Sequence, residues 1–180
     1  MQRILLLIVL LSVASTVPIV AEEADATLLG KLGEGKHSLL DGIAQAEKDN
    51  GMAISAKFEL EDGKLMLSVY TAKDGRDKCA ESNALIELNG DASGTNWRPN
   101  KEVFEDKAHI ARASMQLTLM QLTKLGLADI IKKAAATQKG TVYSAIPSIR
   151  GNKPVVDVLI FNEGKSSALS LDLQTGNVVK

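Results

Sequence analysis

The sequence predicts an α+β fold of two repeated units, each a helix packed on a three- to four-stranded antiparallel sheet, joined by a long amphipathic helix. Three observations predict it. A helical apolar spacing followed by alternating strands occurs twice, tight turns separate the strands, and a further helical stripe lies between the two halves. The predicted organisation is a signal peptide over residues 1–21, a first unit over 22–100, and the linking helix with the second unit over 101–180.

The N-terminal residues have the order of a secretory signal peptide. Arg3 is followed by the apolar run ILLLIVLLSV, and PIVA then leads into the acidic EEADA. The run of about ten residues is well short of the roughly 20 that a membrane-spanning helix needs. We expect cleavage near Ala21 and a periplasmic or secreted protein without a stable membrane span; a retained N-terminal anchor is the alternative.

The first unit is expected to begin with a helix over about residues 38–51. Ser38 and Asp41 have the spacing of a capping box, and Asn50-Gly51 is a typical helix stop. One helical face would carry Leu39, Ile43 and Ala46.

A β-hairpin with a defined register is expected to follow this helix. Apolar and polar residues alternate on both sides of Asp62-Gly63, a strong two-residue turn signal. With that turn, apolar residues face each other in the pairs Leu60–Leu65, Phe58–Leu67 and Ala56–Val69. A slip of one residue would destroy this agreement, so the pattern predicts both the hairpin and its register.

The second half repeats this pattern about 88 residues later. Leu127, Ile131 and Ala134 reproduce the helical spacing, and Gly151-Asn152 takes the place of the first turn. Pro147 lacks an N–H, so its strand is expected to be an edge strand or to carry a bulge. A third strand is predicted in each unit, over residues 83–88 and 167–173.

The segment between the units predicts a helix from about Lys101 to Gln121. Its apolar residues recur at spacings of three and four: Phe104, Ala108, Ala111, Met115, Leu119 and Leu122. We expect this stripe to pack on one or both sheets; a partner-binding helix is the alternative.

The helix and three strands that end on LDLQTGNVV resemble the PepSY domain. The residues that carry the resemblance are Asp172, Thr175, Gly176 and Val178, and the matching region runs from about residue 122 to 180. The first unit departs from the pattern at NGDASGTNW and in its longer loop around Cys79. The resemblance implies an exported protein that inhibits or regulates peptidases, and it supplies no catalytic residues.

Composition argues against several classes of function. Removing residues 1–21 takes away Arg3, which leaves 21 − 1 = 20 basic against 22 acidic side chains. This balance offers no basic surface for nucleic acid. Cys79 is the only cysteine and lies in the polar segment KDGRDKCAES. It is either an incidental exposed thiol or a reactive one able to form an intermolecular disulfide.

The sequence contains no recognisable catalytic or metal-binding constellation. His37 and His109 are the only histidines, and neither G-x-S-x-G nor H-E-x-x-H occurs. We therefore expect no enzyme activity, no cofactor and no bound metal.

The candidate contacts for an exported protein partner lie on one sheet face and on two turns. The face of the sheet away from the core is predicted to carry Met66 and Tyr70 in the first unit and Val155, Leu159 and Phe161 in the second. The turns are Asp62-Gly63 and Gly151-Asn152.

Two functions follow as hypotheses. The first is a non-enzymatic exported protein that binds, and thereby inhibits or regulates, a peptidase or another envelope hydrolase. The alternative is a sensor of a small ligand or envelope signal, held between helix and sheet. A buried pocket lined by the apolar stripe from Met115 to Leu122 would favour the sensor, and a solid core would favour the protein-binding function.

Overall fold

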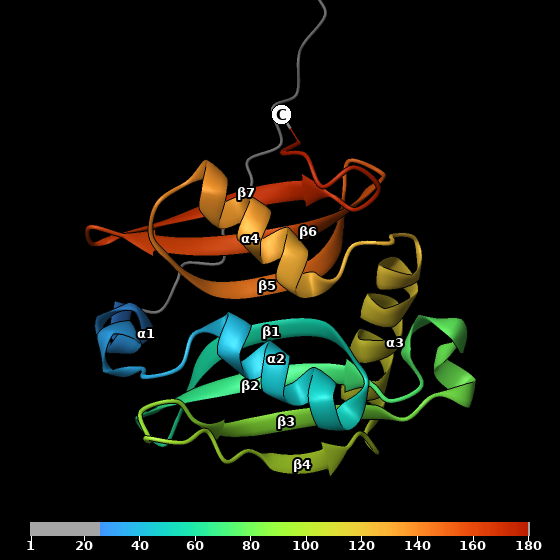
Figure 1. The fold of residues 1–180 in the computed structure, drawn as a ribbon, viewed down its shortest axis with the longest axis horizontal. Helices are drawn as coiled ribbons and strands as arrows, with labels where there is room; N and C mark the ends of the chain where they lie inside the picture. The colour runs from blue at the N-terminus through green and yellow to red at the C-terminus, as the bar shows by residue number, and fades with distance from the viewer. Residues whose placement is uncertain (1–25, 180) are drawn as a thin grey trace, which may run out of the picture.

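The computed structural model describes residues 26–179, so the predicted signal peptide lies outside the described residues. Within them the chain forms one seven-stranded antiparallel sheet, in the order β4-β3-β2-β1-β5-β6-β7, with four α-helices (Figure 1). No helix in this part of the chain has the length and apolar character needed to cross a membrane. The α+β class is therefore confirmed.

The first part of the chain contains two helices and four strands. They are α1 (Ala26–Lys31), α2 (Leu39–Asn50), β1 (Met52–Glu61), β2 (Lys64–Ala72), β3 (Leu85–Asp91) and β4 (Asn100–Val103). Three short 3-10 helices lie at Leu32–Glu34, Gly75–Asp77 and Ala80–Ser82.

The predicted capping box and helix stop fix the ends of α2. The Ser38 hydroxyl accepts from the Asp41 backbone N–H at 3.2 Å, and the Asp41 carboxylate accepts from the Ser38 N–H at 2.8 Å. Gly51 ends the helix at φ +81°, where an added Cβ would lie 2.3 Å from the Lys73 carbonyl oxygen. Only glycine fits this position without a backbone shift.

The predicted register of the first hairpin is confirmed. Leu60 faces Leu65, and the pairs Phe58–Leu67 and Ala56–Val69 follow. Asp62 and Gly63 both have positive φ values, 48° and 73°, as a type I′ turn requires. A bulge between Ala53 and Ser55 shifts the register at the far end of β1.

The second part of the chain contains two helices and three strands. They are α3 (Lys107–Gln121), α4 (Leu127–Thr137), β5 (Thr141–Arg150), β6 (Lys153–Asn162) and β7 (Lys165–Asp172). Gly151 and Asn152 form the predicted turn, again with positive φ values, 53° and 63°. The element order helix-strand-strand-strand thus occurs twice.

The strands of the two halves join into one sheet through β1 and β5. Only two residue pairs connect them, Ala56–Ala145 and Lys57–Ser144. Pro147 lies in β5, which is an interior strand and not the expected edge strand; β5 does carry a bulge, but between Val142 and Ser144 and not at Pro147. It has no N–H to donate, and the pairing with β1 ends before it.

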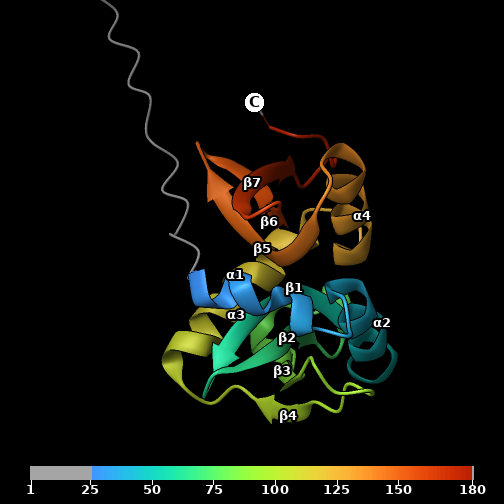
Figure 2. The same ribbon diagram turned by 90° about the vertical axis from the view of Figure 1, so that its left-hand side faces the viewer.

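Helices cover both faces of this sheet. α2 and α4 lie side by side on one face, and α3 crosses the other (Figures 1 and 2). The apolar side chains beneath α2 and α4 belong to one continuous core, which includes Ile43, Leu67, Ile131 and Val158, all at most 2% exposed.

The predicted linking helix begins later than expected. Residues 100–103 form β4 and pair with β3, so the prediction of a helix from Lys101 is wrong. Asp106 caps α3 instead, because its carboxylate accepts from the backbone N–H groups of Ala108 and His109, each at 3.0 Å. Phe104 is buried before the helix starts and packs edge-on against Tyr70.

The predicted apolar stripe of this helix is also largely wrong. Met115 is 45% exposed and Leu122 53%, while Ala108 and Ala111 are exposed as well; Leu119 is buried as expected. The buried face instead carries Ala113, Gln116, Leu117 and Met120. Apolar residues occur on several sides of this helix, so their spacing alone does not determine which side packs on the sheet.

Candidate functional site

A groove of about 420 Å³ lies between one side of α3 and the sheet face on which the helix packs. It spans β2, β1 and β5 and thus bridges the junction between the two halves. Its lining consists of Ser55, Ala56, Lys57, Ser68, Tyr70, Arg112, Met115, Gln116, Ile146, Pro147 and Ser148. Ligand pockets commonly have volumes of roughly 300–1,000 Å³, so this groove suits a small ligand.

Strand periodicity places polar side chains on this face. Ser55 pairs with Tyr70 and Lys57 with Ser68, so all four side chains share the face opposite α2. On the next strand, Lys57 pairs with Ser144, which carries the same face into β5. The groove therefore has a polar floor, although the opposite side of the same strands forms the apolar core.

Gln116 is the buried polar residue of α3 that faces this floor. The residue is 1% exposed, and its side-chain oxygen accepts a hydrogen bond from the Ser55 hydroxyl at 2.8 Å. Within residues 26–179 its side-chain nitrogen donates to no acceptor, although the residue lines the groove. The buried side-chain atoms without a partner in this part of the chain are the Asn50 and Asn89 oxygens, so the Gln116 nitrogen is not one of them and keeps contact with solvent in the groove.

Two cations line the groove, and they differ in their partners. Lys57 forms an ion pair with Glu59. Arg112 lies one helical turn before Gln116, is exposed, and forms no ion pair with any carboxylate of the described residues. Its guanidinium donates to the Tyr70 hydroxyl, and arginine presents several N–H donors, so others remain available to a ligand.

Tyr70 adds a neutral hydroxyl to the groove. Burial, together with the negative charge of Glu87, raises the pKa of Tyr70 to about 12, and Arg112 nearby offsets part of this. The phenol therefore keeps its proton at neutral pH and can donate it. Its ring centroid lies 4.7 Å from that of Phe104, which holds the side chain in place.

The three serine hydroxyls of the groove already donate their protons. Ser55 donates to Gln116, while Ser68 donates to Glu87 and Ser148 to Asp157, each at 2.5 Å. Their oxygens can still accept a hydrogen bond. Burial raises the pKa of Glu87, and the hydrogen bond from Ser68 partly opposes this effect.

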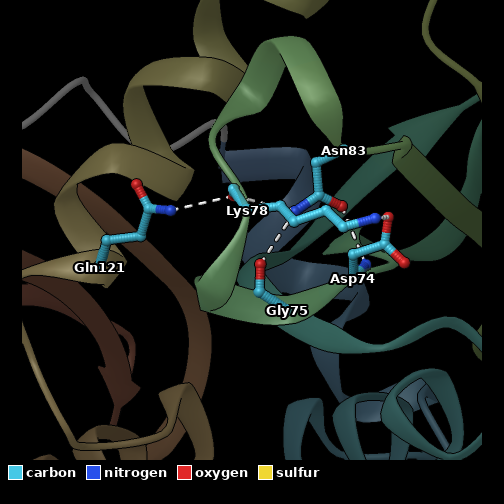
Figure 3. Close-up of polar contacts among 5 residues, drawn as sticks. All are labelled: Asp74, Gly75, Lys78, Asn83 and Gln121. Carbon is cyan, nitrogen blue, oxygen red and sulfur yellow. Dashed lines mark hydrogen bonds and ion pairs between the residues drawn. The ribbon is translucent and has the colours of Figure 1, made fainter.

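The loop that carries Cys79 anchors the C-terminal end of α3. The Gln121 side chain donates to the carbonyl oxygens of Arg76 at 2.9 Å and Lys78 at 3.0 Å, and Asn83 braces the same loop through Gly75 and Lys78 (Figure 3). The Arg76 side chain in turn donates to the carbonyl oxygen of Thr123. We call this set of contacts, made by residues 74–83 with Gln121 and Thr123, the loop latch.

The N-terminal end of α3 is held as well. His109 stacks on Phe104 with ring centroids 5.3 Å apart and hydrogen-bonds to Asp106 at 2.6 Å. The hydrogen bonds from the backbone and side chain of His109 lower the pKa of Asp106. α3 thus lies fixed at both ends across the groove.

Most of the predicted contact residues do not lie together on one exposed surface. Tyr70 lines the groove, and Met66 lies half-buried on the same face. Val155 is fully buried, so it has no surface to offer a partner. Leu159 and Phe161 are half-buried and pack against the core.

The two predicted turns are exposed but lie apart. Because β1 and β5 run antiparallel, the turns Asp62-Gly63 and Gly151-Asn152 lie at opposite ends of the sheet (Figure 1). They do not form one contact surface. Cys79 is an exposed free thiol in the loop latch.

Arg112, Gln116 and the three serines were missed in the sequence. The available signals were a glutamine within an otherwise apolar stretch of helix and serines at strand positions predicted to face away from the core. Neither signal has meaning until α3 is known to cross that face. Among residues 26–179, no group of three or more histidine, cysteine, aspartate or glutamate side chains could hold a metal ion.

Comparisons with known proteins add little. No protein-family model and no curated protein matches the chain. Among solved structures, the chain is similar to a protein classed as a lipoprotein from Clostridium difficile 630, with 16% identity over 81% of this chain and 92% of that one, at a TM-score of 0.41. At these values neither fold nor function is carried over, and the PepSY resemblance stays a prediction.

Proposed function

We propose that the protein is an exported, non-enzymatic binding protein that holds a small ligand in the groove between α3 and the sheet. The observation that carries this proposal is the groove itself, whose lining brings Gln116, Tyr70 and the exposed Arg112 together and includes no acidic side chain. A ligand acceptor in the groove could bind the Gln116 side-chain nitrogen, which makes no hydrogen bond within residues 26–179 and remains open to the groove.

The position of the groove favours the small ligand over the protein partner. A buried pocket lined by residues 115–122 is the feature expected for the sensor; the groove meets this in part, because it is open to solvent and Met115 and Gln116 are the residues of that range that line it. Contacts at both ends of α3 hold the helix, and with it Arg112, Met115 and Gln116, in place beside the groove.

A groove-filling variant tests the proposal. Met115 is 45% exposed at the groove, so Met115→Trp should fill the space without disturbing the core; Ile110→Trp is the matched control, since Ile110 is 40% exposed on α3 and does not line the groove. The exported chain, isolated from its own envelope, would be analysed by native mass spectrometry. We expect a bound small molecule on the wild type and on Ile110→Trp and none on Met115→Trp.

An equal bound mass on all three proteins would contradict the groove as the site. An empty wild type whose melting temperature is unchanged by a dialysed envelope extract would contradict ligand binding itself.

A second candidate function is the inhibition or regulation of an envelope hydrolase through the uncovered part of the same sheet face. Leu159 and Phe161 favour it, because they are partly exposed apolar residues on β6. Capture of one exported hydrolase by the wild type, lost when both residues are replaced by Asp, would support it. Capture that ignores the substitutions would contradict it.

We further infer that the two halves arose by duplication of a PepSY-like unit. The order α2-β1-β2-β3 matches α4-β5-β6-β7, and the first hairpin of each closes with two residues of positive φ.

A further inference from the structure

The side chains that line the groove are basic or neutral, and the nearby acidic side chains are paired with other groups. The lining contains two basic side chains, Lys57 and Arg112, and no acidic one. The nearby carboxylates are already engaged, since Glu59 pairs with Lys57 and Glu87 accepts from Ser68. The same holds for Asp157, which accepts from Ser148 and Ser170 and pairs with Arg150.

The groups that can still donate lie on one side of the groove. Arg112 and Gln116 are four residues apart on α3, so their side chains are neighbours on one helix face. The Tyr70 hydroxyl comes from the sheet beneath them. Guanidinium, amide and phenol groups together suit a carboxylate, which has two oxygens and no proton to donate.

The remaining polar groups of the floor can only accept. The hydroxyl protons of Ser55, Ser68 and Ser148 are directed to protein acceptors, which leaves their oxygens facing the groove. A ligand body that carries hydroxyl or ammonium groups would satisfy them. Ile146, Pro147 and Met115 supply an apolar surface for its carbon atoms.

Resting on the function proposed above, we propose that the ligand is a small organic acid with hydrogen-bond donors on its body, such as a hydroxy or amino acid. Its carboxylate binds Arg112, the Gln116 amide nitrogen and the Tyr70 hydroxyl, and its donors bind the serine oxygens. The same chemistry occurs in a free acid and in the C-terminal residue of a peptide.

Bound molecules identified after extraction from the isolated protein test this assignment directly. Titration calorimetry would then compare three matched probe pairs: lactate with lactamide, serine with serinamide, and glycyl-serine with its C-terminal amide. We expect each acid to bind at least about tenfold more tightly than its amide, because a hydrogen bond to a charged group contributes about 1.5–3 kcal/mol. Single residues binding better than the dipeptide indicate a free acid, and the reverse indicates a peptide end.

Variants of Arg112 test the predicted contact. Arg112 is exposed, so Arg112→Gln should fold normally, weaken the acids at least about tenfold and leave the amides unchanged. Arg112→Lys should restore part of the affinity. The matched control is Arg98→Gln, which removes an exposed arginine that does not line the groove and should bind the acids like the wild type.

The outcomes separate this inference from the proposed function. A neutral or cationic extracted molecule would show that the groove binds a ligand that is not an acid. The same conclusion would follow if the amides bind as tightly as the acids and Met115→Trp abolishes the binding of both. If the protein is empty and no probe binds, both proposals fail.

Discussion

The polar side chains under α3 are arranged in short hydrogen-bonded pairs. Ser55 donates to Gln116 and Ser68 donates to Glu87, so the side-chain oxygen of Gln116 and one side-chain oxygen of Glu87 each have a donor. Pairing of this kind reduces the cost of burying polar groups, which would otherwise be about 1–3 kcal/mol each. The pairs keep a polar surface open within a fold whose stability comes from the opposite face of the same strands.

Glu87 should make the stability of the protein depend on pH. Burial raises its pKa in the folded state, so between the ordinary carboxyl pKa and the raised one the folded protein binds more protons than the unfolded chain. The contribution of Glu87 to the free energy of unfolding is therefore fully present below the ordinary pKa and falls as pH rises through the raised one. Glu87→Gln removes this decline, and the variant should gain stability relative to the wild type between about pH 4 and pH 7.

Urea denaturation of both proteins at the two pH values measures this difference. Ser68 can donate to glutamine as it does to glutamate, so the local contact is retained. A variant that loses stability relative to the wild type as pH rises would show that Glu87 is stabilised in its charged form.

At the scale of elements, α3 packs across the sheet face opposite α2 and α4 and is held at both ends. Its packing contacts are with β1, β3 and β5, and the loop latch fixes its C-terminal end. α2 and α4 cover one face of the sheet, and α3 covers the other, where it buries Leu117 and Met120 and forms one wall of the groove (Figure 2).

Gln121→Ala should loosen the C-terminal end of α3 from the loop over residues 74–83. The change removes two hydrogen bonds to the carbonyl oxygens of Arg76 and Lys78, with an expected loss of about 1–2 kcal/mol in the free energy of unfolding. Amide hydrogen exchange should rise in residues 74–83 and in the last turn of α3. Lys124→Ala, at an exposed position just after the helix, is the control and should change neither quantity. Faster amide exchange in α2 without a change in residues 74–83 would contradict the role of the loop latch in holding α3.

At the scale of the whole molecule, the strands of the two halves form one continuous sheet. Only two residue pairs join β1 to β5, yet α2 also contacts α4, and the buried residues form a single cluster. Small single domains usually unfold in one cooperative transition. The two halves should therefore unfold in a single transition.

Ala145→Asp tests this coupling. Ala145 is fully buried opposite Ala56, so an unpaired carboxylate there should cost more than about 3 kcal/mol. Hydrogen exchange should then rise together in β2 and β6, although the two strands belong to different halves. Ile149→Asp, at a position of the same strand that is 59% exposed, should have little effect. Protection that persists in β2 while β6 loses it would show two independent domains.

Local patterns predicted the elements that depend on neighbouring residues. The capping box at Ser38, the register around Asp62-Gly63 and the turn at Gly151-Asn152 are set by short-range hydrogen bonds and backbone conformations. Such features depend on the identity of a few adjacent residues. The start of α3 was missed because β4 forms only where β3 offers it an edge.

The sequence by itself determined the α+β class, both hairpins and most of the core positions, because side-chain periodicity and turn chemistry act over a few residues. Only the tertiary structure decided that β1 and β5 join two sheets into one, and that α3 turns Gln116 rather than Met115 inward. These choices depend on contacts between segments far apart in the chain, where a weakly amphipathic helix can present any of several faces. The groove exists only where those long-range contacts meet.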